Sequence, residues 1–359
     1  MGDGGHLKRT LGERCQLASN ESPLAPSPRV IDAIVREAGH LNRYPARGDA
    51  DLTAALAAHH GRGLTPAHFV TACSGYETLD LVARAFLAAD DTAIISNPAF
   101  PVYARTIALQ CANVIDVPLD PVTFLPHVDR ILAALDDRTR LVYLCNPGNP
   151  TGVVTPARLL DALVASLPPH VTLVVDEVYH HFADRGALPD VVAHVVANAR
   201  VVVVHSFSKA YGLAGLRLGY AIAPPGLAAR LASFRREYHL SRLHLAAGLA
   251  ALEDGEHVAR VVALVRAGRD AICAGLDRLG VTHWPSQANF VLFRPPGPAR
   301  DLHRALAAAG IDIRPTDGFG LPGALRVSVG LADENAHFID VLGGLLGSAG
   351  PTSDLEVRH

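Results

Sequence analysis

Lys209 is the residue whose position first suggests chemistry. It lies in SFSKAYGLAGLRLGY, residues 206–220, directly after the apolar run VVVV at 201–204. Because moving an ammonium out of water is costly unless it is paired or neutralised, a lysine next to a buried strand needs a bonding partner. Arg217, eight residues further along, adds a guanidinium to the same segment.

Polar residues also follow other apolar runs of the sequence. Ser74-Gly75-Tyr76 follow HFVTAC, Phe100 follows the Asn97-Pro98 that ends TAIISNP, Asn149 lies in NPGNPTG after RLVYLC, and Asp176 and Tyr179 follow VTLVV. If these runs are strands of a parallel sheet, their carboxyl ends meet at one edge, where ligands of open α/β sheets bind. Taken singly, each residue also fits a helix cap, a turn or a solvated surface position.

One group of these residues is suited to a phosphate. The backbone N–H groups of Gly75 and Tyr76 would stand at a helix N-terminus, a natural anion site. The hydroxyls of Ser206 and Ser208 and the guanidinium of Arg217 would complete the cradle.

The remaining residues are suited to a heteroaromatic aldehyde. Asp176 would pair with a protonated ring nitrogen, while Tyr179 and Asn149 would hydrogen-bond a ring oxygen. Phe100 would cover one ring face, and Lys209 would bond covalently to the aldehyde. Together with the phosphate cradle, this inventory describes pyridoxal 5′-phosphate (PLP) and gives the lysine its partner, an imine.

The ordered motifs NPGNPTG, DEVY (176–179) and SFSKAYGLAGLRLG resemble those of the class I and II aminotransferases of PLP fold type I. LASNESPL (17–24) and LNRYP (41–45) are most similar to the histidinol-phosphate aminotransferase branch, and the resemblance runs from about residue 17 to 345. It implies that Lys209 forms the Schiff base and that Lys209, Asp176 and Tyr179 are the catalytic residues. The implied reaction moves an amino group between an L-amino acid or amino-alcohol phosphate and a 2-oxo acid such as 2-oxoglutarate.

The resemblance also assigns residues outside the cofactor set. Arg326, in ALRVSVG, matches the arginine that grips the substrate carboxylate, and Asn20, in LASNESPL, falls on the substrate side. For Arg314, in GIDIRP, contact with a substrate side chain and a structural role both stay open. Tyr44 matches a residue that reaches the phosphate in the neighbouring subunit's site, so a homodimer is expected.

Some features differ from the family pattern. Tyr76 stands where an acidic residue is usual, REYHLSRLHLAA (236–247) departs from the usual substrate-side sequence, and only sixteen residues precede LASNE. An aminotransferase for another aromatic or basic amino acid therefore stays open, as does a decarboxylase or cyclase of the same fold. His180-His181 lacks the third ligand of a zinc motif, so no metal is expected.

The elements that must position these residues alternate between β-branched runs and helical patterns. Candidate strands are 68–73, 92–97, 112–119, 140–146, 171–177, 200–208 and 218–224. Continuously apolar strands are typical of a sheet covered on both faces. The fold expected is a three-layer α/β/α large domain with a mostly parallel seven-stranded sheet, plus a smaller α+β domain, as in the PLP-dependent transferases.

The division along the chain follows changes in pattern. Residues 1–30 are expected to pack on the small domain, 31–250 to form the large domain, 251–347 the small domain and 348–359 a disordered tail. Within the small domain, apolar residues from Val258 to Leu279 predict a long amphipathic helix.

Bulk properties exclude several classes of protein. Hydrophobic residues make up 49% of the chain and charged residues 19%, which is typical of a well-packed globular protein. A net charge of −3 gives no general attraction to nucleic acid or to an anionic membrane. Five scattered cysteines, with no C-x-x-C pair, favour reduced thiols in the cytoplasm.

Overall fold

A computed structural model describes residues 14–348 of the chain. Its large sheet has seven strands, and all seven predicted strands are confirmed, six with shorter bounds and β5 shifted by one residue at equal length. In spatial order the sheet consists of β2 (Phe69–Ala72), β8 (Gly219–Ile222), β7 (Val201–Ser206), β6 (Thr172–Asp176), β5 (Thr139–Cys145), β3 (Thr92–Ile95) and β4 (Asn113–Asp116).

The sheet is mostly parallel, as expected. Only β8 runs against its neighbours, pairing antiparallel with both β2 and β7. The pairs β7–β6, β6–β5, β5–β3 and β3–β4 are all parallel. The carboxyl ends of five neighbouring strands therefore meet at the same edge.

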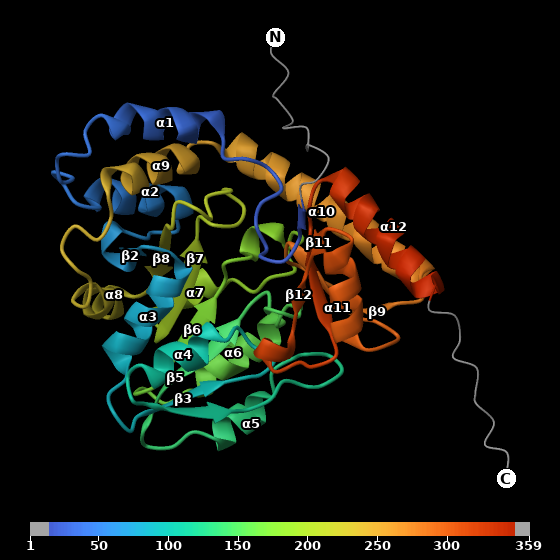
Figure 1. Cartoon of the computed structure of the whole chain (residues 1–359). Coiled ribbons are helices and arrows are strands. Elements are labelled where there is room, and N and C mark those ends of the chain that lie inside the picture. The colour runs from blue at the N-terminus through green and yellow to red at the C-terminus, as the bar shows by residue number, and fades with distance from the viewer. Residues whose placement is uncertain (1–13, 349–359) are drawn as a thin grey trace.

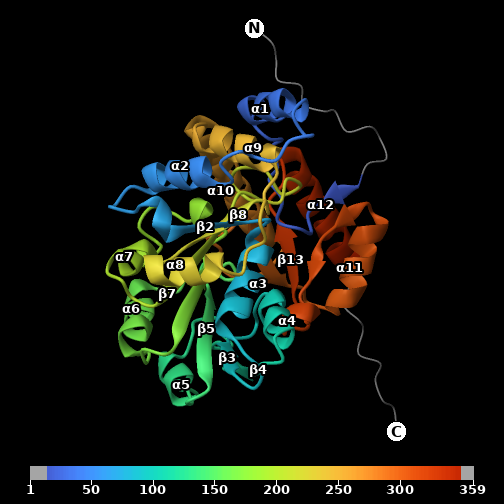
Figure 2. The same ribbon diagram turned by 90° about the vertical axis from the view of Figure 1, so that its left-hand side faces the viewer.

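Helices cover both faces of this sheet, as the two ribbon views show (Figure 1, Figure 2). On one face, the core is built with residues from α1 (Pro28–Ala38), α2 (Ala50–His60), α5 (Val128–Ala133), α6 (Ala157–Ser166), α7 (Val191–Val196) and α9 (Arg242–Leu252). On the other face, it is built with residues from α3 (Gly75–Phe86), α4 (Val102–Ala108) and α8 (Pro225–Ala232).

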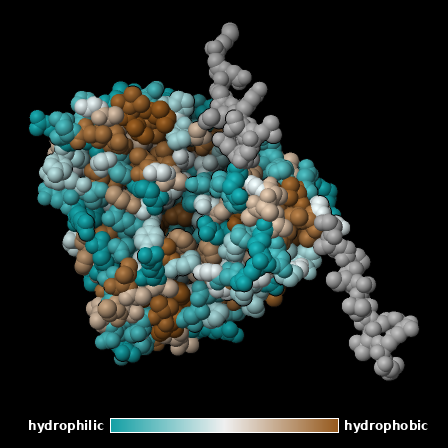
Figure 3. Space-filling model, in the orientation of Figure 1, coloured by the Kyte–Doolittle hydropathy of each residue, from teal (hydrophilic) through white to brown (hydrophobic). Residues whose placement is uncertain are grey.

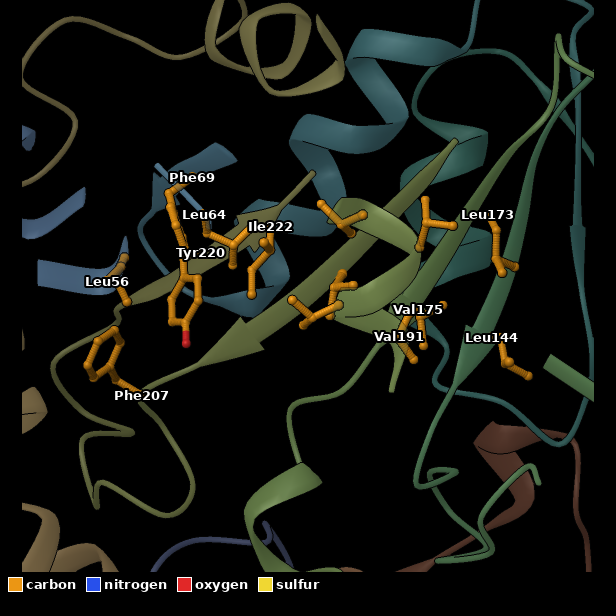
Figure 4. Packing of buried hydrophobic residues seen from close by; sticks show 14 of the residues in the cluster. Leu56, Leu64, Phe69, Leu144, Leu173, Val175, Val191, Phe207, Tyr220 and Ile222 are labelled. Atoms are coloured by element: carbon orange, nitrogen blue, oxygen red, sulfur yellow. The ribbon is translucent and has the colours of Figure 1, made fainter. Parts of the chain in front are cut away.

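Alternate residues of the strands supply the two core layers. In β6, Leu173 and Val175 belong to the first layer and Val174 to the second, because successive side chains of a strand point to opposite faces. Figure 4 shows the first layer, with Tyr220 and Ile222 of β8 beside Phe69 of β2. Burial on both faces explains why these strands read as continuous apolar runs.

The C-terminal part forms a second core. Its four-stranded antiparallel sheet has the order β12 (Arg314–Pro315), β13 (Leu325–Ser328), β10 (Phe290–Arg294), β9 (Thr282–His283). The helices are α10 (Gly255–Arg278), α11 (Ala299–Ala308) and α12 (Ala332–Ser348). The predicted amphipathic helix is confirmed as α10, which buries Val261, Val265, Ile272 and Leu276.

The N-terminal segment joins this second core through strand pairing. β1 (Cys15–Gln16) lies parallel to β11 (Ile311–Asp312). Short 3-10 helices complete the fold: η1 (Pro66–His68), η2 (His180–Phe182) and η3 (Asp317–Phe319). The domain boundaries at 31, 251 and 348 stay predictions, and the expected tail lies outside the described residues except for Ser348. Within residues 14–348, no helix has the length and apolar content needed to cross a bilayer.

Candidate active site

A cleft of about 850 Å³ lies where the carboxyl ends of the large sheet face the second core. Every predicted site residue except Tyr44 lines it: Asn20, Gly75, Tyr76, Phe100, Asn149, Asp176, Tyr179, Ser206, Ser208, Lys209, Arg217, Arg314 and Arg326. Residues far apart in the chain thus converge on one cavity. Other residues that line the cleft, among them Ser19, Glu21 and Phe319, were not predicted to be site residues.

The start of α3 forms one end of the cleft. Ser74 caps this helix, because its hydroxyl accepts a hydrogen bond from Glu77 N–H at 3.2 Å. The N–H groups of the first helical residues, Gly75 and Tyr76, have no acceptor within the helix. Beside them, the Ser206 hydroxyl accepts the Ser208 N–H at 3.0 Å. This end of the cleft is suited to an anion.

Arg217 adds a positive charge at the same end. Its side chain is exposed and lines the cleft, and Nη1 donates to Ala214 O at 2.9 Å. Only this one donor of the guanidinium is used within the described part of the chain. The others are available to a ligand in the cleft.

Asp176 ends β6 and is the buried carboxylate of the site. Its side chain accepts hydrogen bonds from Tyr103 Oη at 2.8 Å and from Val178 N–H at 3.3 Å. Burial raises the pKa of the carboxyl group to about 6, while the bond from Tyr103 opposes the rise. The described residues give Asp176 no ion pair, so a cationic ligand atom would be a fitting partner.

Tyr179 lies three residues after Asp176 and is held by two amides. Asn20 Nδ2 donates to the phenol oxygen at 3.1 Å and Asn149 Nδ2 at 3.3 Å. Burial raises the pKa of the phenol well above its usual value, so the hydroxyl keeps its proton. That proton is available to an oxygen of a ligand.

Asn20 is deeply buried, and both ends of its amide are already used. Besides bonding Tyr179, it accepts the Ser328 hydroxyl on Oδ1 at 3.1 Å. Its backbone adopts a left-handed conformation with φ of 53°, which Asn tolerates better than most residues. The side chain predicted to bind substrate therefore also braces the site.

Lys209 follows β7 by three residues and is only partly exposed. Its Nζ donates to Asn20 O at 2.9 Å and to Ser19 O at 3.3 Å. Burial lowers the pKa of the amine to about 8, and the positive charge of Arg326 acts in the same direction. A substantial fraction of the amine is therefore neutral near pH 7.5, as a nucleophile or base requires.

Arg326, in β13, is buried at the other end of the cleft. Nη1 donates to Asn149 Oδ1 at 2.5 Å and Nη2 to Ala18 O at 2.9 Å. Nε is buried and has no hydrogen-bond partner among the described residues. Arg314, in β12, is exposed and lines the same end, with Nε bonded to Ala18 O at 3.3 Å.

Tyr44 is the one predicted site residue that lies outside the cleft. It is 74% exposed and stacks on Tyr238, with ring centroids 4.4 Å apart. It is not among the residues that line the cleft together with the start of α3.

Tyr103 is a site residue that sequence reasoning missed. It is buried in α4, where its hydroxyl bonds Asp176 and its ring meets the edge of Phe100 at a centroid distance of 5.9 Å. It follows no strand and belongs to no motif. The only signal was its spacing of three from Phe100, which places both residues near one face of a helical turn.

The donor set fits PLP. The helix start, two serines and Arg217 suit the phosphate, Asp176 suits the ring nitrogen, and the lysine with its lowered pKa suits the aldehyde. Gly219 supports the fit, because a Cβ there would lie 2.5 Å from Gly75 N. The backbone approaches closely where the phosphate would lie, as glycines allow in such cradles.

The mostly parallel sheet, with a lysine shortly after one of its strands, and the donor set of the cleft together define the class of protein: a PLP-dependent enzyme. A family model described as "Aminotransferase class I and II" matches residues 13–342. The chain belongs to this family, and it is a PLP-dependent aminotransferase.

Curated relatives cover nearly the whole chain. Histidinol-phosphate aminotransferase 2 of Pseudomonas aeruginosa is 38% identical over 92% of this chain and 89% of its own length. Histidinol-phosphate aminotransferase 2 of Methylococcus capsulatus is 39% identical over 95% of this chain and 93% of its own.

Solved structures of aminotransferases have the same fold as this chain. The histidinol-phosphate aminotransferase of Sinorhizobium meliloti in complex with PLP superposes with a TM-score of 0.84 at 29% identity, covering 94% of this chain and 91% of that one. A double mutant of Thermus thermophilus aspartate aminotransferase gives 0.83 at 26% identity, covering 93% and 92%. The expected fold and cofactor are thereby confirmed.

Proposed function

We propose that this aminotransferase takes its amino group from an amino-alcohol phosphate of the histidinol-phosphate type and passes it to a 2-oxo acid such as 2-oxoglutarate. The observation that carries the proposal is the pair Arg314 and Arg326 at the end of the cleft away from α3. Burial lowers the pKa of the Arg326 guanidinium to about 10, and the nearby charge of Arg314 acts in the same direction. Two adjacent guanidinium groups favour a doubly charged phosphate over a singly charged carboxylate. The names of the curated relatives support the same substrate class.

The catalytic roles of the chain's residues follow from their positions. PLP, when bound, supplies the sink for the electrons released at the donor carbon. Asp176 keeps a proton on the ring nitrogen because its buried carboxylate pairs best with a cation. Lys209 moves a proton at the donor carbon, since its amine is readily neutral, and the carbonyls of Ser19 and Asn20 orient it.

Three further residues position the reactants. Arg326 fixes the anionic group of the donor, so that the bond to be broken points toward Lys209. Tyr179, held in place by two amides, would donate a hydrogen bond to the ring oxygen and keep its own proton. Phe100 closes one ring face and excludes water.

An amino-donor screen with 2-oxoglutarate tests the substrate class. L-histidinol phosphate, L-histidinol, L-phenylalanine and L-arginine are compared by the glutamate that each produces. We expect the phosphate ester to give the highest kcat/KM. A charge-assisted hydrogen bond is worth about 1.5–3 kcal/mol, so Arg314→Gln should cost about 10–150-fold with this donor and little with L-histidinol.

Arg304→Gln is the matched control, since Arg304 is 72% exposed in its side chain and does not line the cleft. A preference for an aromatic or basic amino acid would replace the proposal with the alternative aminotransferase. Release of carbon dioxide in place of glutamate would favour the decarboxylase.

We also propose that the protein acts as a homodimer in the cytoplasm. The exposed position of Tyr44 supports a role in the neighbouring subunit's phosphate site. The five cysteines are scattered along the chain with no C-x-x-C pair, which supports a reducing compartment.

A further inference from the structure

Tyr103 is attached directly to the carboxylate that would hold the ring nitrogen. Its hydroxyl donates to Asp176 Oδ2 at 2.8 Å, and the other oxygen, Oδ1, accepts only the longer bond from Val178 N–H at 3.3 Å. Tyr103 is 1% exposed. The phenol therefore supplies the shorter and more strongly shielded of the two bonds to this carboxylate.

The ring of Tyr103 is fixed by its neighbours. It stacks on Tyr143 with centroids 5.1 Å apart and planes 20° apart, and it meets Phe100 edge-on at 88°. Such aromatic pairs define a ring position well. Tyr103 thus contacts both Asp176, which would hold the ring nitrogen, and Phe100, which would cover the ring face.

A charged carboxylate in such apolar surroundings depends on its donors. Burial favours the neutral acid of Asp176, whereas a hydrogen bond donated to the carboxylate favours the charged form. Among the described residues, the Tyr103 hydroxyl is the only side-chain donor hydrogen-bonded to Asp176.

From this geometry we infer that Tyr103 is a positioning residue: its hydroxyl keeps Asp176 charged and aimed at the ring nitrogen, so that the proton stays on the ring and not on the carboxylate. The inference rests on the proposed role of Asp176. Without the hydroxyl, the carboxylate binds the shared proton more strongly, and the ring loses positive charge.

Tyr103→Phe tests the hydroxyl alone, because the ring and its packing remain. The readout is a pH titration of the absorbance of the PLP-loaded protein, recorded beside the PLP dissociation constant. A ring with less positive charge holds its remaining protons more tightly. We therefore expect the pH midpoint of the absorbance change to be higher in Tyr103→Phe than in the wild type. Asp176→Asn should move it in the same direction and further.

Turnover should fall in parallel. The lost bond is of the charge-assisted kind, so kcat/KM should fall about 10–150-fold in Tyr103→Phe. The loss should be greater in Asp176→Asn.

Tyr143→Phe is the matched control, since Tyr143 is a buried tyrosine of the same stack whose hydroxyl is not bonded to Asp176. An upward shift in Tyr103→Phe together with an unchanged midpoint in Tyr143→Phe supports the inference. An equal shift in both variants overturns it, because loss of packing would then be the cause. An unchanged midpoint in Tyr103→Phe, with a shifted one in Asp176→Asn, overturns the role of Tyr103 alone. An unchanged midpoint in Asp176→Asn overturns the role proposed for Asp176.

A second variant covers the case in which Tyr103→Phe fails to fold. Fluorotyrosine at position 103 leaves the shape nearly unchanged and makes the phenol a stronger donor. The midpoint should then move downward, opposite to Tyr103→Phe. An upward shift or no shift contradicts the inference.

Discussion

At the scale of single residues, the site is an arrangement of groups whose protonation is set by burial. Lys209 and Asp176 are shifted in opposite senses, each toward its neutral form. The amine becomes easier to use as a base, and the carboxylate needs a cation to remain charged. The aldehyde of PLP would react with the neutral amine of Lys209, and its protonated ring nitrogen would be the cation that Asp176 needs.

The lowered pKa of Lys209 predicts how the cofactor-free protein reacts with PLP. A lysine with its pKa at about 8 is neutral above that pH, so the rate of bond formation should rise across pH 7–9 with its midpoint near 8. Arg326→Gln should move the midpoint upward, because it removes a like charge. The measurement is borohydride trapping at a series of pH values, followed by peptide mass analysis.

The low lysine content of the chain makes the site of trapping easy to assign. Lys8 is the only other lysine in the chain, so trapped PLP can be assigned without ambiguity, and Lys8→Arg serves as a control. Label on Lys209 that appears only near pH 10.5, the ordinary value for lysine, would contradict the assigned environment.

At the scale of elements, the anion end of the cleft depends on how closely β8 approaches the start of α3. A Cβ at Gly219 would lie 2.5 Å from Gly75 N and 2.6 Å from Ser74 C, both backbone atoms that cannot turn aside. The helix N-terminus and the strand must therefore separate if the glycine is replaced.

Gly219→Ala should weaken PLP binding, because it displaces the N–H groups at the start of α3. Overpacking of this kind costs about 1–3 kcal/mol, or about 5–150-fold in the dissociation constant if all of it falls on the bound state. Equilibrium titration with PLP measures the effect. Gly226→Ala is the control, since nothing lies within 4 Å of a Cβ there and Gly226 does not line the cleft. Equal affinities for the two variants would show that the close approach has no part in binding.

Elements were easier to predict than the contacts among them. The seven strands could be located because burial on both faces makes them continuously apolar, and the polar residues that follow them could be expected at one edge. The hydrogen bonds from Tyr103 to Asp176 and from Asn20 to Tyr179 could not be expected. The first bond joins residues that are 73 positions apart in the sequence, and the second joins residues that are 159 positions apart. Such contacts depend on packing that no local pattern encodes.

At the scale of the whole molecule, the surface near Tyr44 suggests a partner. Large apolar side chains are exposed on α1 and on the loops beside it: Ile31, Val35, Leu41, Tyr44 and Tyr238. Figure 3 shows a hydrophobic patch over α1. Contiguous exposed apolar surface of this kind is typical of an interface. A twofold dimer through this face would carry each Tyr44 away from its own chain's cleft and toward its partner's.

Mixing two inactive variants tests whether Tyr44 acts across such an interface. Tyr44→Ala keeps Lys209, and Lys209→Ala keeps Tyr44. If the site combines Lys209 of one subunit with Tyr44 of the other, each mixed dimer regains one complete site. Random re-association of equal amounts then restores activity to about a quarter of the wild-type value, since half of the dimers are mixed and each has one intact site of two. Unmixed samples of each variant, taken through the same dissociation and re-association, provide the baseline. Activity that stays at this baseline, although mass measurements detect mixed dimers, would place Tyr44 in its own chain's site or in none.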